Sequence, residues 1–348
     1  MKLDNLYIQA LGSYLPEQRL TLQQATEEGY DSDDLASEVL ESLDDYETIA
    51  VGGDLAPADM AVAAARAALA AADSKIAMLI HAQMFRQGPE TWSPVGYLLR
   101  ELGIDGATGF EVEQGANGVL AAVQLAAGWL AMAPDTSAAL VTTALNAGSA
   151  YLDRFRSAGT KTIYGDGAAA AVLGRGSGIA RVDSINSLMI PGLEGLCRGS
   201  APLFDEGRVR QMVNLGERGR EFVHEKGMEV MDLIKGATRI KVESAHQALS
   251  EAGVEPKDLA AVVHTHANPA VIDMSVMHPL GLDLARSSWS FGKTIGHVGA
   301  ADHLLGLEHF ITSGTVTEGD HVLLIGRANG CNFSSAVVTI TTGTAIMP

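Results

Sequence analysis

The sequence predicts a layered α/β protein with helices on both faces of mixed β-sheets. Hydrophobic residues make up 47% of the 348 positions and charged residues only 19%, so the chain can bury a large core. Short apolar runs of strand length alternate along the chain with longer helical stretches. Because these runs lack polar alternation, we expect strands buried on both faces, as in a sheet covered by helices.

Five stretches are predicted to form helices. The most apolar one needs a check, because residues 116–134 carry no charge and approach the length of a membrane span, about 20 residues. It contains Asn117, Gln124 and two glycines and lies within a pattern of alternating strands and helices, so we interpret it as a buried core helix. In chain order, the predicted helices are residues 57–72, 93–102, 117–133, 221–252 and 300–312.

Seven runs have strand length, are mostly apolar and are bounded by Gly, Asp or Pro. Around residues 174–180, three glycines follow one of these strands, and a new series of strands and helices starts beyond them. The similar element order on both sides suggests an old duplication, with an N-terminal half of residues 1–176 and a C-terminal half of residues 177–348. The predicted strands are residues 76–81, 109–112, 138–143, 168–173, 260–264, 321–325 and 335–341.

The segment 183–221 is predicted to be the least regular part of the chain. It mixes prolines and glycines with a basic cluster that stands out in an acidic protein. The cluster could receive the phosphates of a ligand or an acidic partner domain, or it could be a solvated loop. Its members are Arg198, Arg208, Arg210, Arg218 and Arg220.

Charge and cysteine usage exclude several classes of protein. The 42 acidic and 24 basic residues give a net charge of −18, so nucleic acid or an anionic membrane would be repelled. Cys197 and Cys331 lie far apart with no CxxC pattern, which argues against a disulfide framework or a zinc site and fits a reduced cytoplasmic setting. The N-terminus lacks a sustained apolar run, so no secretory signal is expected.

Four local patterns spread over the chain are similar to those of ketoacyl synthase III and the wider thiolase superfamily. They are GSYLPEQ at residues 12–18, GDGAAAAVL at 165–173, KGMEVM at 226–231 and FGKTIGH at 291–297. The second pattern is the most specific of the four. The resemblance implies a thiolase-like duplicated fold, layered αβαβα, with two mixed five-stranded sheets.

The nucleophile of that family is a cysteine at the start of a buried helix. Here FEVEQGANGV at residues 110–119 matches the segment without gaps and places Ala116 at the cysteine position. A strand feeding a tight turn into a helix would put side chain 116 at the positive end of the helix dipole, which favours a thiolate. Alanine cannot do this chemistry. Either the natural protein is non-catalytic or the nucleophile has been replaced, which we favour, and we expect the Ala116 form to be inactive.

The condensing members of the family add a histidine from an HQAN-like turn and an asparagine from a GNTS turn. In this sequence Asn268 matches the end of the first turn, but Thr265 stands at the histidine position, between His264 and His266. Lys293 takes the asparagine position. These departures weaken the prediction of a decarboxylating enzyme, although a one-residue slip could restore a histidine.

The sequence instead contains GHVGAAD at residues 296–302. A histidine oriented by an aspartate can deprotonate a nucleophile or an alcohol. His297 and Asp302 are five residues apart, about 140° on a continuous helix, so His297 must lie in the turn and Asp302 in the following helix. The pattern resembles a branch of ketoacyl synthase III-like acyltransferases that use Cys-His-Asp and esterify alcohols.

The resemblance also implies an oxyanion site. The segment 326–337, GRANGCNFSSAV, is similar to the C-terminal glycine-rich turn of the family. Backbone N–H groups of residue 116 and of Asn329 or Gly330 would then converge on the thioester oxygen. Cys331 matches a packing residue.

The same resemblance implies a malonyl-type acyl donor carried on coenzyme A or an acyl carrier protein, and no metal or redox cofactor. The implied acceptor is a hydroxyl such as a deoxysugar of a glycosylated polyketide. A homodimer is expected, because relatives pair their sheets edge to edge and the apolar run 138–143 would otherwise risk aggregation. The implied substrate-binding residues are Gly227, Met228, Met231, Thr265, His266 and Asn268, with Arg86, Lys293 and Arg327 as candidate cations for the malonyl carboxylate.

Two alternatives stay open at this point. One is a decarboxylating condensing enzyme, which would release carbon dioxide and form a carbon–carbon bond. The other is a non-catalytic subunit that shapes the acyl tunnel of a partner, and the natural residue at position 116 would decide between that subunit and an enzyme.

Overall fold

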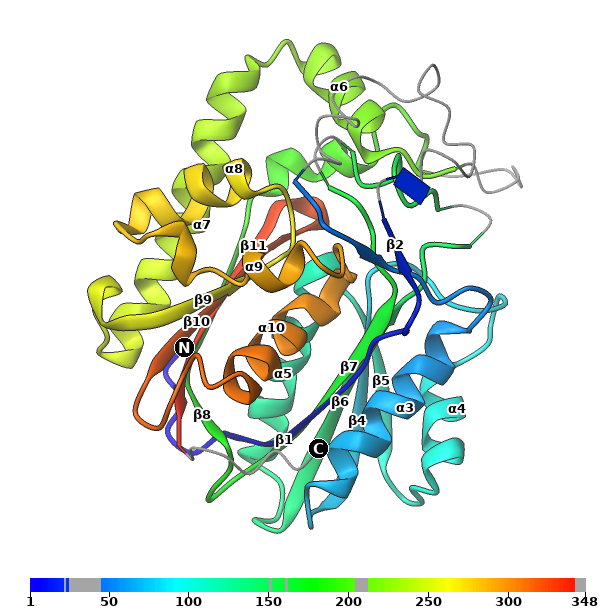
Figure 1. The fold of residues 1–348 in the computed structure, drawn as a ribbon, viewed down its shortest axis with the longest axis vertical. Helices are drawn as coiled ribbons and strands as arrows, with labels where there is room; N and C mark the ends of the chain where they lie inside the picture. Colours follow the sequence, from blue (N-terminus) through cyan, green and yellow to red (C-terminus); the bar gives the residue numbers. More distant parts are fainter. Residues whose placement is uncertain (22, 25–44, 150–151, 160–161, 204–211, 342–348) are drawn as a thin grey trace.

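The fold is built on one mixed sheet of nine strands in the computed structural model (Figure 1). The model describes residues 1–21, 23–24, 45–149, 152–159, 162–203 and 212–341. The strand order is β5-β4-β6-β7-β1-β8-β11-β10-β9. A separate small ribbon pairs β2 (Arg19–Leu20) with β3 (Ile49–Ala50).

The first half of the sheet comes from the N-terminal part of the chain. Its parallel core is β4 between β5 and β6, and β6, β7 and β1 then pair antiparallel. The strands are β1 (Tyr7–Tyr14), β4 (Lys75–Gln83), β5 (Thr108–Glu113), β6 (Ser137–Leu145) and β7 (Gly167–Gly174).

The second half repeats this pairing with one strand fewer. Here β9 is parallel to β10, and β10, β11 and β8 pair antiparallel. An isolated parallel bridge between Val262 and Ser287 stands where the first half has β5. The strands are β8 (Ala180–Met189), β9 (Leu259–His264), β10 (His321–Ala328) and β11 (Asn332–Ile340).

The thiolase-like α/β fold is therefore confirmed, but the strand count differs from the expected two five-stranded sheets. The two halves join into one sheet because the first residues of β1 also pair with β8, at Tyr7 with Arg181 and Ile8 with Ala180. The boundary between halves at residue 176 stays a prediction.

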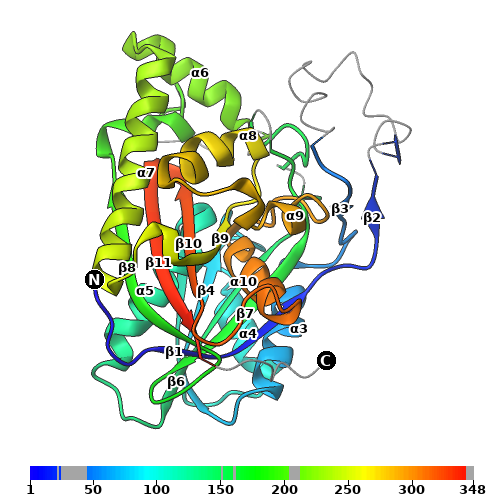
Figure 2. The same ribbon diagram turned by 60° about the vertical axis from the view of Figure 1, so that its left-hand side comes forward.

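Helices form three layers around the folded sheet (Figures 1 and 2). On one outer side, α3 packs on β1, β6 and β7, and α4 packs beside α3. On the other outer side, α7 packs on β8 and β11. The central layer holds α5 and α10. The bounds are α3 (Pro57–Ala70), α4 (Pro94–Leu102), α5 (Gly118–Leu130), α7 (Val230–Ala252) and α10 (Asp302–Thr312).

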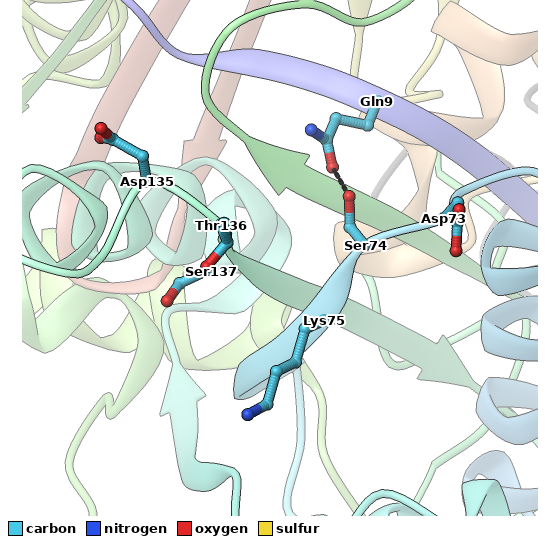
Figure 3. A pocket seen from close by; sticks show the side chains of 7 residues that line it. All are labelled: Gln9, Asp73, Ser74, Lys75, Asp135, Thr136 and Ser137. Carbon is cyan, nitrogen blue, oxygen red and sulfur yellow. Dashed lines mark hydrogen bonds between the residues drawn. The ribbon is translucent and has the colours of Figure 1, made fainter.

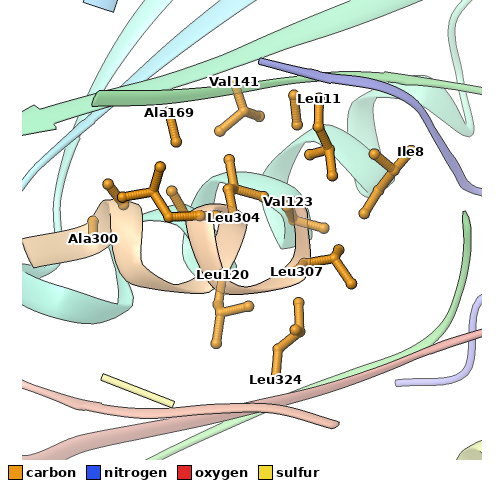
Figure 4. Close-up of a cluster of buried hydrophobic side chains, with 14 of the residues drawn as sticks. Ile8, Leu11, Leu120, Val123, Val141, Ala169, Ala300, Leu304, Leu307 and Leu324 are labelled. Carbon is orange, nitrogen blue, oxygen red and sulfur yellow. The ribbon is translucent and has the colours of Figure 1, made fainter. Parts of the chain in front are cut away.

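The central helices are enclosed by apolar side chains from both halves of the sheet (Figure 4). Leu304 of α10 faces Val141 and Ala169 on one side, and Leu324 of β10 lies on the other (Figure 4). Most of α5 is thus buried, as its lack of charge predicts, whereas Leu125 and Met132 of the predicted segment 117–133 are exposed. No helix among the described residues has the length and apolar content needed to cross a membrane.

Two predictions about the middle of the chain were wrong. The first part of segment 183–221 is not irregular, because Ala180–Met189 forms β8 in the centre of the sheet. The predicted helix 221–252 is two helices, α6 (Leu215–Lys226) and α7, separated at Gly227. Gly227 has a φ of 59°, a left-handed conformation that glycine adopts without strain and that ends a helix.

Two very short helices, α8 (Pro269–Ile272) and α9 (Trp289–Gly292), follow β9 in the second half. A surface cavity of about 580 Å³ lies at the amino ends of β4 and β6, lined by residues such as Lys75 and Ser137 (Figure 3). It is at the opposite end of these strands from the site described below.

Candidate active site

Ala116 lies at the tip of a helix in the centre of the molecule. The end of β5 leads into a 3-10 turn, η1 (Gly115–Asn117), which runs directly into α5. Ala116 is buried, with 4% of its surface exposed. Since the first N–H groups of a helix have no partner within it, side chain 116 sits at the electropositive end of α5.

The turn of Ala116 packs against the C-terminal turn that was expected to supply the oxyanion site. Gly115 has a φ of 52°, and a Cβ built on it would lie 3.0 Å from the backbone nitrogen of Asn329. The side chain of Asn117 fixes this contact: its Nδ2 donates to the carbonyls of Gly326 (3.3 Å) and Asn332 (3.1 Å). The backbone around residue 116 is therefore anchored to the turn containing Asn329 and Gly330.

His297 and Asp302 form a buried pair. His297 precedes a second 3-10 turn, η7 (Gly299–Ala301), and Asp302 is the first residue of α10. The Nδ1 of His297 lies 2.5 Å from Oδ2 of Asp302. Only 6% of His297 and none of Asp302 is exposed.

Three further contacts hold the Asp302 carboxylate in place. Oδ2 accepts the backbone N–H of His266 at 2.7 Å, and Oδ1 accepts the backbone N–H of Val298 at 2.8 Å. The Nδ1 of His266 lies 3.2 Å from Oδ1. Burial raises the pKa of Asp302, but the charges and hydrogen bonds of His266 and His297 outweigh burial, and the net pKa lies well below that of an ordinary carboxyl. The group is therefore an anion that orients two histidines.

The GDG motif of the sequence holds the backbone of His297. His297 donates its N–H to Ile163 at 2.8 Å and accepts from Gly165 N–H at 3.0 Å. A Cβ on Gly165 would lie 1.9 Å from the carbonyl oxygen of Ile295, so this position has no room for a side chain. The ring of Tyr164 stacks on His297 with centroids 5.5 Å apart.

The aspartate of the same motif, Asp166, is held by a different set of hydrogen bonds and an ion pair. Asp166 is fully buried and forms a two-pronged ion pair with Arg154, at 3.0 and 2.8 Å. It also accepts the backbone N–H groups of Gly52 and Ala147. The motif therefore holds the turn that carries His297 in place.

The two halves of the molecule contribute matching helix ends to this site. In each, a 3-10 turn begins with a glycine in the left-handed region, Gly115 at φ 52° and Gly299 at φ 64°, and runs into a central helix. The turns η1 and η7 contact each other. One helix end thus carries residue 116 and the other carries Asp302.

Of the predicted substrate-binding residues, His266 belongs to this cluster and Asn268 lies just beyond it. The amide of Asn268 donates to Asp45 and caps α8 by accepting from Ala270 N–H. Thr265 lies between His264 and His266 at the end of β9 and is partly exposed. The ring of His264 is buried, and its Nε2 has no partner among the described residues.

The segment 226–231, which contains the predicted substrate-binding residues Gly227, Met228 and Met231, lies on the surface of the C-terminal half. Met228 lines a groove of about 450 Å³ between α7 and the 3-10 helix Pro191–Cys197, together with Leu193 and Leu233. Met231 is 59% exposed. Gly227 forms the break between α6 and α7 described above.

The candidate cations have different surroundings. Arg86 pairs with Glu90 at 3.0 Å, and Lys293 pairs with Glu47 near the surface. Arg327 is exposed near the end of β10, and its Nη2 contacts Cys331 Sγ at 3.6 Å. In the basic cluster, Arg198 pairs with Glu194 and Arg218 donates to the carbonyl of Cys197. Arg208 and Arg210 lie outside the described residues.

Both cysteines are free thiols. Cys331 is buried, and burial raises the pKa of its thiol, which disfavours the nucleophilic thiolate. Cys197 is half-buried and contacts Asn329 Oδ1 at 3.8 Å, so it lies beside the proposed oxyanion turn. The sequence alone offered no motif that would place Cys197 there.

Sequence reasoning also missed one member of the cluster, Tyr164, and did not predict the contact of His266 with Asp302. Tyr164 stands next to a recognised motif, but its stacking on a residue more than 100 positions away has no local signal. His266 was expected to bind substrate, whereas the structure also makes it a second partner of Asp302.

Comparisons with known proteins agree with this architecture. Residues 249–340 match the family model described as 3-oxoacyl-[acyl-carrier-protein] synthase III, C-terminal. The acetoacetyl CoA synthase NphT7 of Streptomyces sp. (strain CL190) is 30% identical over 298 residues, covering 82% of this chain and 84% of that protein. A beta-ketoacyl-[acyl-carrier-protein] synthase III of Desulfitobacterium hafniense (strain Y51) is 28% identical over 243 residues, covering 68% of each chain.

Solved structures show the same relationship. The acyltransferase ChlB3 superposes with a TM-score of 0.88 and 32% identity, covering 97% of this chain and 98% of that one. The 3-oxoacyl-(acyl carrier protein) synthase III, FabH, of Pseudomonas aeruginosa PAO1 shares the fold, with a TM-score of 0.76 at 21% identity and coverage of 98% and 100%.

A duplicated α/β sheet around two central helices, with residue 116 at one helix tip, defines a protein of the thiolase superfamily. Within that superfamily, this chain belongs to the ketoacyl synthase III family. Its relatives are acyl-transferring or condensing enzymes.

Proposed function

We propose that the protein, with a cysteine at position 116, is an acyltransferase that moves an intact malonyl-type group to a hydroxyl and forms an ester. The donor is a thioester of coenzyme A or of an acyl carrier protein. The Ala116 form is inactive, because a methyl group cannot form the acyl-enzyme. The observation that carries the proposal is the buried His297–Asp302 pair, which supplies a base beside the helix tip of residue 116.

The reaction has two half-reactions. In the first, the thiolate at 116 attacks the donor carbonyl, a carbon–sulfur bond forms to the protein, and the carrier leaves as a thiol after taking up a proton. Backbone N–H groups of residue 116 and of Asn329 or Gly330 stabilise the oxyanion. The helix dipole keeps the thiol ionised, so this step needs little help from a base.

In the second half-reaction the acceptor hydroxyl attacks the acyl-enzyme. Asp302 engages Nδ1 of His297, which leaves Nε2 as the nitrogen able to accept the hydroxyl proton. The carbon–oxygen bond forms, the carbon–sulfur bond to residue 116 breaks, and the thiolate is regenerated. Asp302 stabilises the imidazolium that forms in this step.

The finer identity of donor and acceptor rests on resemblance. The sequence is similar to CerJ, the malonyltransferase of cervimycin biosynthesis, which suggests malonyl as the acyl group and a deoxysugar of a polyketide glycoside as the acceptor. The acyltransferase ChlB3, at 32% identity, supports transfer to an acceptor in general.

The test is the Ala116→Cys protein incubated with malonyl-coenzyme A. We expect intact mass spectrometry to show one malonyl adduct, and peptide mapping to place it on residue 116. Because Cys197 lies near the same turn, Ala116→Cys/Cys197→Ser is the matched control and should be acylated equally. Absence of an adduct on either protein while coenzyme A still binds would contradict the proposal.

A second candidate function is decarboxylating condensation. It is favoured by one observation: the Nε2 of His266 is buried and has no partner among the described residues, so it could donate a hydrogen bond to a thioester oxygen. Carbon dioxide release that depends on His266, together with a carbon–carbon product, would favour it over esterification. A gene that encodes alanine at position 116 would favour the non-catalytic subunit.

A further inference from the structure

Lys241, in the middle of α7, is a buried lysine with no counter-charge in the part of the chain that the structure describes. Only 9% of its surface is exposed. Its Nζ donates to the hydroxyl of Ser275 at 3.2 Å, and no carboxylate among the described residues pairs with it. An ammonium group is costly to remove from water unless an anion compensates it, so folding alone gives no reason to place one here.

A second cation lies close to the first. Arg327 is two residues beyond Ile325 on β10 and shares with it the face that packs against α7. Its charge, after burial, contributes to lowering the pKa of Lys241 to about 8. The positive charge of Arg327 thus adds to the free-energy cost of keeping Lys241 charged.

The surroundings of the pair are polar and incompletely satisfied. The hydroxyls of Ser244 on α7 and Ser335 on β11 lie 3.1 Å apart. The positive charge of Lys241 contributes to lowering the pKa of the buried His264 ring. The Nε2 atom of this ring has no partner among the described residues. Lys241 itself has a serine hydroxyl, and no carboxylate, as its side-chain partner among the described residues.

This region adjoins the candidate active site along two strands. On β10, the residues after Arg327 are Ala328 and Asn329, which pack against Gly115. On β9, the residues after His264 are Thr265 and His266, and His266 binds Asp302. Arg327 therefore lies at the carboxyl end of β10, next to the turns that surround residue 116, and Lys241 lies on α7, which packs on β10.

We propose that Lys241 and Arg327 form the subsite for the terminal carboxylate of a dicarboxylic acyl donor. This inference rests on the proposed function and adds the residues that select the acyl group. The carboxylate supplies the missing negative charge and accepts hydrogen bonds from both side chains. Ion pairing also stabilises the carboxylate relative to the neutral carbon dioxide it would otherwise become, which keeps the acyl group intact.

The Ala116 protein is suited to the test, because it binds the donor without becoming acylated. Isothermal titration should show malonyl-coenzyme A binding at least about tenfold more tightly than acetyl-coenzyme A. Lys241→Met nearly keeps the length of the side chain and removes its charge. It should weaken the binding of malonyl-coenzyme A at least about tenfold and leave the binding of acetyl-coenzyme A unchanged. Lys235→Met, on the exposed side of the same helix, is the matched control and should change neither.

Arg327→Gln provides an independent variant, because Arg327 is exposed and its loss leaves the core untouched. It should also weaken the binding of malonyl-coenzyme A without weakening the binding of acetyl-coenzyme A. Equal binding of the malonyl and acetyl thioesters by the parent protein would overturn the proposal. So would an equal loss of both thioesters and of free coenzyme A in the variants, since it would assign the pair to the donor phosphates.

The outcome is separable from that of the proposed function. If Ala116→Cys forms no adduct but malonyl binding still depends on Lys241, the acyl-transfer proposal fails and the carboxylate subsite stands. If the adduct forms equally well from acetyl- and malonyl-coenzyme A, and Lys241→Met changes neither, the subsite fails and acyl transfer stands.

Discussion

At the scale of single residues, the site is defined by one carboxylate shared between two histidines. Asp302 touches His297 and His266, together with two backbone N–H groups, and none of it is exposed. A carboxylate with this many donors stays ionised and fixed. In the proposed reaction Asp302 orients and stabilises His297 as a base, so we expect the two half-reactions to depend on it differently.

In the Ala116→Cys background, His297→Ala should still form the acyl-enzyme but stall transfer to the alcohol, whose proton has a pKa far above neutral. Asp302→Asn should slow transfer by roughly 10²–10⁴, by misorienting the imidazole and by removing its counter-charge. Thr265→Ala should change either step much less. Rapid-quench measurement resolves the two steps, and unimpaired ester formation by His297→Ala would exclude His297 as the base.

Two buried histidines predict a loss of stability in acid. Burial lowers the pKa of His264 to about 3 and that of His303 to about 4. The unfolded chain, with histidine pKa values near 6.5, binds protons before the folded chain does, so stability falls as the pH drops from about 6.5 toward 4. For His303 alone, we expect a loss of about 2 kcal/mol between pH 7 and pH 5.

Urea unfolding of His303→Leu at both pH values measures this contribution. The pH dependence of the variant should be smaller than that of the parent by about 2 kcal/mol. His246→Leu, at an exposed position on α7, serves as the control for loss of a histidine. An unchanged pH dependence in His303→Leu would mean that His303 is already protonated, or exposed, in the folded protein.

At the scale of elements, the GDG turn determines where His297 lies. Gly165 donates its backbone N–H to the carbonyl of His297 and leaves no space for a methyl group, which would lie 1.9 Å from Ile295 O. Gly165→Ala must therefore displace the turn or the motif. We expect it to slow ester transfer more than acyl-enzyme formation and to destabilise the fold by about 1–3 kcal/mol.

Gly236→Ala is the matched control, because Gly236 is helical in α7 and a Cβ there would meet nothing within 4 Å. It should stabilise the protein by up to about 1 kcal/mol without changing either half-reaction. Chemical denaturation and rapid-quench assays on both variants make the comparison. Equal behaviour of the two alanine variants would show that the turn does not position His297.

The elements also show how far the sequence predicts the structure. Long apolar runs such as β6 and α5 are recognisable, because they are largely buried and contain no charged residue. The strand β8 is not, since it contains Asp183, Ser184 and Asn186. Two of these side chains find partners in distant elements, Asp183 with Thr339 and Ser184 with the carbonyl of Ala248. The contact of His266 with Asp302 spans 36 residues, so only the fold could reveal it.

At the scale of the whole molecule, duplication explains why the site is central. Each half contributes one central helix, α5 or α10, that lies between the two outer helix layers. The turns that begin these two helices contact each other. The two edges of the sheet differ in one respect. At one end β9 is buried along most of its length, whereas at the other end five of the six residues of β5 are exposed.

This difference changes the basis of the predicted homodimer. The apolar run 138–143 lies in β6, which is paired on both sides by β4 and β7 and is therefore not an edge. The open edge is β5, where Phe110 is 52% exposed. An edge strand with free backbone groups and an exposed aromatic ring is a template for pairing with another chain.

We therefore expect two copies to pair through β5, because this pairing satisfies the free N–H and C=O groups and buries Phe110 in both copies at once. Sedimentation equilibrium should show a dimer at micromolar concentration. Phe110→Lys should shift the protein toward monomer, since two like charges would face each other across the symmetry axis. Met274→Lys, at a methionine beyond α8 that is 65% exposed, should remain dimeric. A parent protein that stays monomeric, or a Phe110→Lys variant that dimerises as tightly as the parent, would show that β5 is not the interface.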